Sequence, residues 1–126
     1  MRSIGILGFA LWLLVVASFA CTRTDGAQIT DVAREFLAAA ADGDSIAVRK
    51  SSVGGQPLRF WEHYRADQQL LRTAAAGLKL DTAREVPDTG STVALFTFVF
   101  RGERRSVSAE FVKVDGVHLI SRIYIS

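Results

Sequence analysis

Apolar residues recur every three or four positions over residues 29–40, which predicts an amphipathic first helix. Thr30 is a candidate N-cap for this helix, and Gly43 marks its end. Residues 44–48 favour a short second helix, and the Gly- and Ser-rich stretch at 51–55 predicts a loop.

A second helical pattern covers Leu58 to Ala76, with Pro57 in its first turn and Gly77 as its C-cap. The pattern predicts the longest helix of the chain. Its apolar stripe consists of Trp61, Tyr64, Leu71 and Ala75.

After Gly77 the hydrophobic period changes to two, which predicts four β-strands in an antiparallel meander. The expected turns are Pro87-Asp88-Thr89-Gly90, Arg101-Gly102-Glu103-Arg104 and Asp115-Gly116. A two-residue loop at Gly102-Glu103 places Phe96 opposite Ala109, and one at Asp115-Gly116 places Phe111 opposite Ile120. A three-residue loop at 88–90 places Leu80 opposite Phe98.

In this register one sheet face is rich in aromatic residues, and we expect it to pack on the helices. We also expect a ligand pocket between this face and the helices. Its candidate residues are Trp61, Tyr64, Phe96, Phe98, His118, Arg122 and Tyr124. An arginine among apolar side chains needs a carboxylate or a ligand anion, and an ion-paired, purely structural Arg122 is the alternative. A slip of the third hairpin would turn Arg122 outward.

The opposite sheet face is more aliphatic than a water-facing sheet usually is. Its apolar residues are Val93, Leu95, Val99, Val112, Leu119, Ile123 and Ile125. An apolar patch of this extent generally marks an interface, so we expect a homodimer formed through the open sheet face.

Two local patterns carry a resemblance to a known family. The first helix ends Phe36-Leu37-Ala38-Ala39-Ala40-Ala41-Asp42-Gly43-Asp44, and the last hairpin reads Val112-Lys113-Val114-Asp115-Gly116-Val117-His118-Leu119-Ile120. With this order of helices and strands, nearly all of the mature chain resembles the nuclear-transport-factor-like superfamily.

The resemblance implies an α+β fold of the cystatin-like, nuclear-transport-factor-like kind. In that fold, amino-terminal helices pack on one face of a curved four-stranded antiparallel meander and form a cone with an internal pocket. Members include isomerases, dehydratases and binding domains, so the resemblance does not assign a function. Family isomerases use a carboxylate base with an acidic oxyanion donor, and dehydratases use His with Asp. Neither pair is evident in the predicted interior strands.

The first 20 residues are typical of a signal peptide. Arg2 supplies a positive charge, and Ile4 to Phe19 is an uncharged apolar run, shorter than the roughly 20 residues of a membrane-spanning helix. Ala20-Cys21 then resembles the end of a bacterial lipoprotein signal, in which a small residue precedes the lipid-modified cysteine. Ser18-Phe19-Ala20 also fits ordinary signal-peptidase cleavage, which is the alternative.

Cys21 is the only cysteine, so in an oxidising compartment it would be an unpaired thiol unless it carried a lipid. We therefore expect a signal peptide over 1–20, a lipidated Cys21 with a short tether over 21–28, and one folded domain over 29–126. The expected location is the cell envelope, with the exported protein anchored in the membrane. A soluble secreted or periplasmic protein is the alternative.

Composition narrows the function only slightly. The chain of 126 residues has room for one domain, and 15 Lys and Arg against 13 Asp and Glu do not predict nucleic-acid binding. We expect no metal and no other cofactor, and Arg101, Arg104 and Arg105 are expected to form a solvated turn. The leading hypothesis is a non-catalytic domain that binds a small apolar or anionic ligand or a partner protein. The alternative is a small isomerase or lyase that uses His118 and Tyr124.

Overall fold

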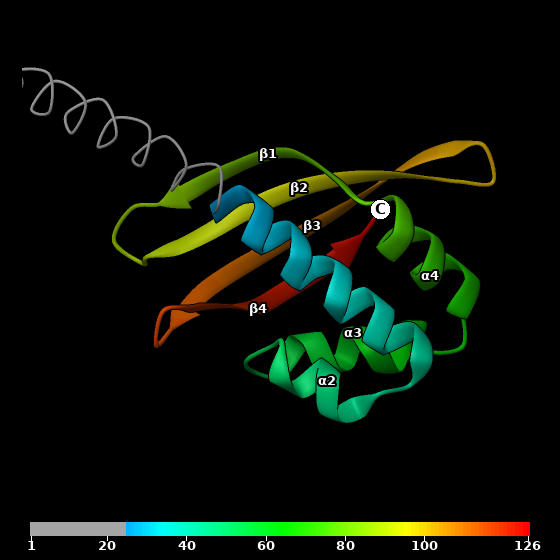
Figure 1. Ribbon diagram of the computed structural model, residues 1–126, viewed down its shortest axis with the longest axis horizontal. Coiled ribbons are helices and arrows are strands. Elements are labelled where there is room, and N and C mark those ends of the chain that lie inside the picture. The colour runs from blue at the N-terminus through cyan, green and yellow to red at the C-terminus, as the bar shows by residue number, and fades with distance from the viewer. Residues whose placement is uncertain (1–24) are drawn as a thin grey trace, which may run out of the picture.

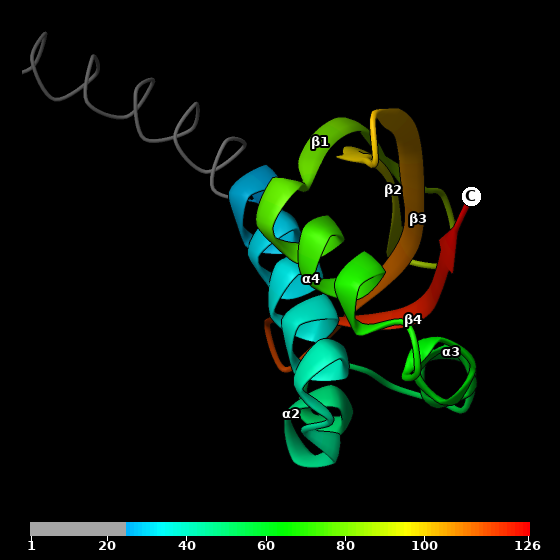
Figure 2. The same ribbon diagram turned by 90° about the vertical axis from the view of Figure 1, so that its right-hand side faces the viewer.

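The computed structural model describes residues 25–126, in which four helices precede four β-strands. The helices lie on one face of a curved antiparallel sheet whose strand order is β1-β2-β3-β4 (Figure 1, Figure 2). The predicted α+β class and the predicted meander are confirmed. The signal peptide and Cys21 lie outside the described residues.

The first helix, residues 25–42, lies across the sheet (Figure 1). Its spacing produces the expected buried stripe of Ile29, Ala33, Phe36, Leu37 and Ala40. Residues 25–28, expected in the tether, are helical, so Thr30 is not an N-cap. Its hydroxyl instead donates to the Gly26 carbonyl one turn earlier, over 2.8 Å. Gly43 ends the helix as predicted, with a φ of 72° that favours glycine.

The single helix predicted over 58–76 is wrong, because the chain forms two helices there. These are α3 (Gln56–Tyr64) and α4 (Gln68–Gly77), and the first helix exceeds both in length. The break lets α3 pack on β4 while α4 packs on β2, and one straight helix could not follow both ends of a curved sheet. None of the helices within residues 25–126 is long and apolar enough to cross a membrane.

The strands are β1 (Lys79–Val86), β2 (Ser91–Phe100), β3 (Glu103–Val114) and β4 (Val117–Ile125). The second hairpin turns at Arg101-Gly102 rather than at Gly102-Glu103, because both turn residues have positive φ, at 52° and 78°. Phe96 therefore faces Val107 instead of Ala109. The shift is two residues, so the predicted faces of β2 and β3 are unchanged.

Of the other two hairpins, the last is as predicted and the first is not. The Asp115-Gly116 turn is confirmed and places Phe111 opposite Ile120. The first hairpin has a four-residue connection, and Leu80 lies opposite Phe96 rather than Phe98.

A bulge in β4 overturns the predicted orientation of the last four residues of the strand. Phe111 pairs with Ile120, but Glu110 pairs with Arg122, so one extra residue, Ser121, enters β4. Ile120 and Ile123 are both fully buried, whereas Arg122 and Tyr124 lie on the outer face. The reason is energetic. The unbulged register would bury the Arg122 guanidinium, and it would expose Ile123, whose burial stabilises the fold by about 2 kcal/mol. Ile125 also turns inward and packs against the core.

The chain segment after α2 (Ser45–Lys50) covers the free edge of β4 at this bulge. The Ile120 N–H donates to the Ser51 carbonyl over 2.9 Å, and the Val53 N–H donates to the Ile120 carbonyl over 2.8 Å. The Gln56 amide then bonds both backbone groups of Ile123, each over 2.8 Å. These four hydrogen bonds satisfy the β4 backbone and fix the bulge.

The bulge predicts effects of very different size for two adjacent substitutions. Ile123→Ala should lower the free energy of unfolding by about 2–5 kcal/mol because it opens a cavity in the core. Tyr124→Ala, at a side chain that is 52% exposed, should lower it by no more than about 0.5 kcal/mol. Urea unfolding followed by circular dichroism measures both losses. A larger loss for Tyr124→Ala than for Ile123→Ala would contradict the bulge and support the unbulged register.

Candidate functional site

A pocket of about 520 Å³ lies at the amino-terminal end of the first helix. The helix contributes Asp25, Gly26 and Ile29, and the sheet contributes residues from all four strands and from the first turn. The sheet residues are Leu80, Ala83, Arg84, Glu85, Gly90, Thr92, Lys113 and His118.

His118 is the chemically distinctive residue of this pocket. Its side chain is buried, with 7% of the residue exposed, and neither ring nitrogen has a hydrogen-bond partner among residues 25–126. The Asp25 carboxylate lies 3.8 Å from Nε2. A buried polar group without a partner costs about 1–3 kcal/mol, which a ligand that bonds the imidazole would recover. One nitrogen of a neutral imidazole donates and the other accepts.

The rest of the pocket is amphipathic. Ile29 and Leu80 supply apolar surface, whereas Arg84, Glu85 and Lys113 supply charge. No group of three metal-ligating side chains occurs in the described part of the chain. This lining suits a small molecule with an apolar body and at least one hydrogen-bonding group.

Two of the predicted pocket residues lie at the other end of the first helix. Trp61 donates from Nε1 to the Ala40 carbonyl over 3.2 Å, and the Tyr64 ring packs on Phe60 with centroids 4.7 Å apart. Ala40 is fifteen residues beyond Asp25, or about 22 Å along the helix. Trp61 and Tyr64 therefore do not meet His118.

Side chains fill the space between these two ends. Phe96 is fully buried and packs edge-on against Phe111, with centroids 6.2 Å apart. Phe36 and Ile120 are also fully buried. Phe98 is buried as well and borders a separate cleft beside α4. The expected single pocket over the centre of the sheet is thus replaced by packed core.

Arg122 and Tyr124 were predicted to face the helices, and this is wrong. The bulge at Ser121 turns both to the outer face, where they border a hollow of about 150 Å³ together with Glu110. Arg122 therefore does not enter an apolar interior.

Sequence reasoning missed Asp25, which was assigned to the tether. A usable signal was present, because Asp25 precedes Ile29 by four residues and therefore falls on the same face of a helix extended backwards. Lys113 was missed for a different reason. It lies directly opposite His118 across the last hairpin, but the position of the pocket at this hairpin is known only from the structure.

In comparisons with protein-family models, with curated proteins and with solved structures, the chain matches none of them. The site is accordingly interpreted from its own residues.

Replacing His118 tests whether its nitrogens are unsatisfied. His118→Leu should raise the free energy of unfolding by about 1 kcal/mol, because a buried polar group without a partner is replaced by an apolar group of similar size. His63→Leu, at an exposed position on α3, should change it by less than about 0.5 kcal/mol. Chemical unfolding measures both, and a loss of more than about 1 kcal/mol in His118→Leu would mean that the imidazole is fully bonded.

Proposed function

We propose that this protein is an exported, membrane-anchored domain that binds a small amphipathic ligand in the pocket at His118. The observation that carries the proposal is the buried imidazole, which has no hydrogen-bond partner among the described residues and faces a cavity of about 520 Å³. Binding sites often retain such unpaired polar groups at a cost in stability.

The charges around the pocket support a ligand with a polar or anionic group near its opening. Arg84 and Lys113 can attract an anionic group, and Asp25 and Glu85 can accept hydrogen bonds from ligand hydroxyls. Ile29 and Leu80 then contact the apolar body. These charged, hydrogen-bonding and apolar groups are sufficient for a non-catalytic binding role.

The isomerase or lyase alternative requires different residues from those first considered. Tyr124 lies on the opposite sheet face and cannot act with His118. Asp25, 3.8 Å from Nε2, can instead orient His118 as a general base after a small rotation. This pair is the single observation that favours chemistry.

The anchor supports a location close to a bilayer. Three residues lie between Cys21 and Asp25, so the reach over the four Cα steps is at most about 14 Å. A lipidated Cys21 would therefore hold the pocket near the lipid headgroups, where amphipathic ligands concentrate. Several acyl chains on one cysteine provide stable anchoring.

The fold family is part of the same proposal. Helices on one face of a curved four-stranded meander, the Gly43-Asp44 turn that caps α2, and the tight last hairpin all support a nuclear-transport-factor-like cone. Folds of this kind host many functions, so the family supports a pocket at one end of the sheet but not its ligand.

We also propose that two copies associate through the outer sheet face. With Ile123 and Ile125 turned inward, the face carries Val93, Leu95, Val99, Val112, Leu119 and Tyr124. Glu110 and Arg122 lie side by side on it and form no ion pair with each other within the described chain. A two-fold axis between them brings each Glu110 to the other copy's Arg122, so the face is self-complementary.

Mass spectrometry of the full chain purified from membranes tests the anchor and the ligand together. The expected result is a chain that begins at an acylated Cys21 and carries a small amphipathic molecule. His118→Leu should lose the molecule because the imidazole bonds it, and His63→Leu should retain it.

Each other outcome has a defined meaning. A ligand that persists in His118→Leu would contradict the proposed site. An unmodified Cys21 in the soluble fraction would establish the secreted alternative. Two bound species that differ by one water, or by the position of a double bond, would favour the lyase or isomerase.

Sedimentation equilibrium tests the dimer. Leu95→Glu should weaken association at least about 100-fold, because burying an unpaired charge costs about 3 kcal/mol. Ile46→Glu is the matched control, since Ile46 is 68% exposed on α2, which belongs to the helical layer. A monomeric wild-type chain, or equal dimerisation of both variants, would exclude this interface.

A further inference from the structure

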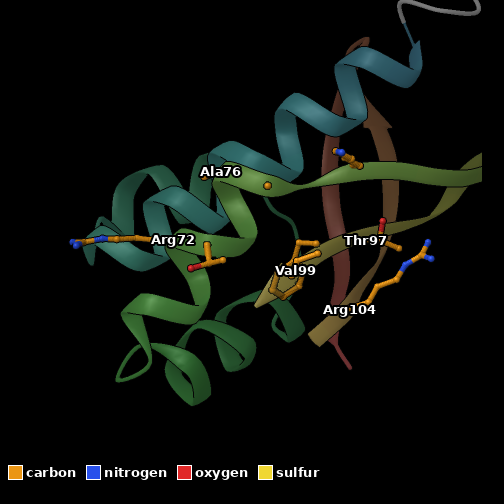
Figure 3. Close-up of a pocket in the computed structure, with 9 residues that line it drawn as sticks. Arg72, Ala76, Thr97, Val99 and Arg104 are labelled. Carbon is orange, nitrogen blue, oxygen red and sulfur yellow. The ribbon is translucent and has the colours of Figure 1, made fainter. Parts of the chain in front are cut away.

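A second cleft, of about 820 Å³, lies between α4 and the strands β1 and β2 (Figure 3). It arises because β1 begins at Lys79, opposite Thr97, whereas β2 continues to Phe100 with only β3 beside it. The tip of the β2–β3 hairpin closes one end, where Arg101 Nη2 donates to Gln69 Oε1 over 3.4 Å. The cleft is thus a product of two strands of unequal length.

The polar lining of this cleft is positively charged. Lys79, Arg72 and Arg104 border it together with the hydroxyls of Thr73 and Thr97, and no carboxylate is among its lining residues. Arg72 points away from Arg104 and is 3.6 Å from Asp42, so its charge is partly neutralised (Figure 3). Lys79 and Arg104 form no ion pair within residues 25–126. Two available cations therefore remain.

The apolar part of the lining comes from Ala76 and Gly77 of α4 and from Phe98 and Val99 of β2. Phe98 faces the helices, and the Gly77 backbone approaches it closely enough for a Cβ there to lie 3.9 Å from the Phe98 Cβ. Val99 lies on the outer side of the strand, so the cleft opens around the part of β2 that β1 leaves uncovered. An apolar lining with cations at its rim matches a ligand that has a short apolar body and an anionic head.

This cleft is separate from the His118 pocket. Lys79 borders the cleft and the next residue, Leu80, borders the His118 pocket, but successive residues of a strand point to opposite faces of the sheet. No residue lines both sites, so the two can be disabled independently.

We propose that the cleft between α4 and β2 binds an amphipathic anion, either a carboxylate or a phosphate on a short apolar body, through Lys79 and Arg104. Both a free metabolite and a lipid headgroup offer this chemistry. Thr97 adds a hydroxyl donor beside the two cations, since it pairs with Lys79 across β1 and β2.

Lysine footprinting of the full chain in neutral phosphatidylcholine nanodiscs tests this site. The chain has three lysines, of which Lys79 borders the cleft and Lys50 is exposed on α2. With n-butyl phosphate as the probe, the acetylation rate of Lys79, measured by mass spectrometry, should fall at least about fivefold at saturation. The rate at Lys50 should not change. Arg104→Gln should weaken the protection about fivefold, the loss expected for one exposed ion pair, and Arg49→Gln should not.

A second arm of the experiment, in nanodiscs that contain phosphatidylglycerol, distinguishes a lipid headgroup from a free anion. Protection of Lys79 there without butyl phosphate assigns the site to a headgroup, and protection only by butyl phosphate assigns it to a free anion. Equal protection of Lys50 and Lys79, or none at Lys79 in either arm, would overturn the proposal. Because His118 is not involved, neither result depends on the first pocket.

Discussion

Hydrogen bonds between residues 51–56 and the free edge of β4 are the constraint on which the rest of the structure depends. They bind Ile120 and Ile123 on either side of Ser121, so the strand gains one residue without leaving its backbone groups unpaired. Because both isoleucines then face the helices, α3 obtains an apolar surface on β4. The same bulge sends Arg122 to the outer face, where it stays hydrated.

This packing determines where ligands can bind. Phe36, Phe96, Phe111 and Ile120 fill the middle of the space between the helices and the sheet. Both proposed sites therefore lie outside this packed region, at the margins of the sheet. One site has a buried imidazole beside a carboxylate, and the other has cations beside apolar side chains.

The two sites also differ in how their charge is arranged. At His118, side chains of both charges surround a buried imidazole, so the proposed ligand would be selected by hydrogen-bond direction. At the α4 cleft, Lys79 and Arg104 carry charge of one sign near solvent, so recognition depends on net charge and weakens with salt. The two proposed sites would therefore prefer different ligands, a polar amphipathic molecule at His118 and an anion at the α4 cleft.

The local sequence determined the order of elements, the stop at Gly43, the Asp115-Gly116 turn and the aromatic inner face, because each depends on the spacing of neighbouring residues or on the φ of one turn. It also contained a sign of the bulge, since Ile120-Ser121-Arg122-Ile123 cannot bury both isoleucines with a strict period of two. Only tertiary structure decided between burying Arg122 and inserting a bulge, because the β4 backbone is bonded by the Ser51 carbonyl and the Gln56 side chain, which are remote in sequence. The split of the predicted long helix, the approach of Asp25 to His118 and the α4 cleft have the same origin. Each depends on how the curved sheet brings together segments that are distant in sequence, which no local sequence pattern predicts.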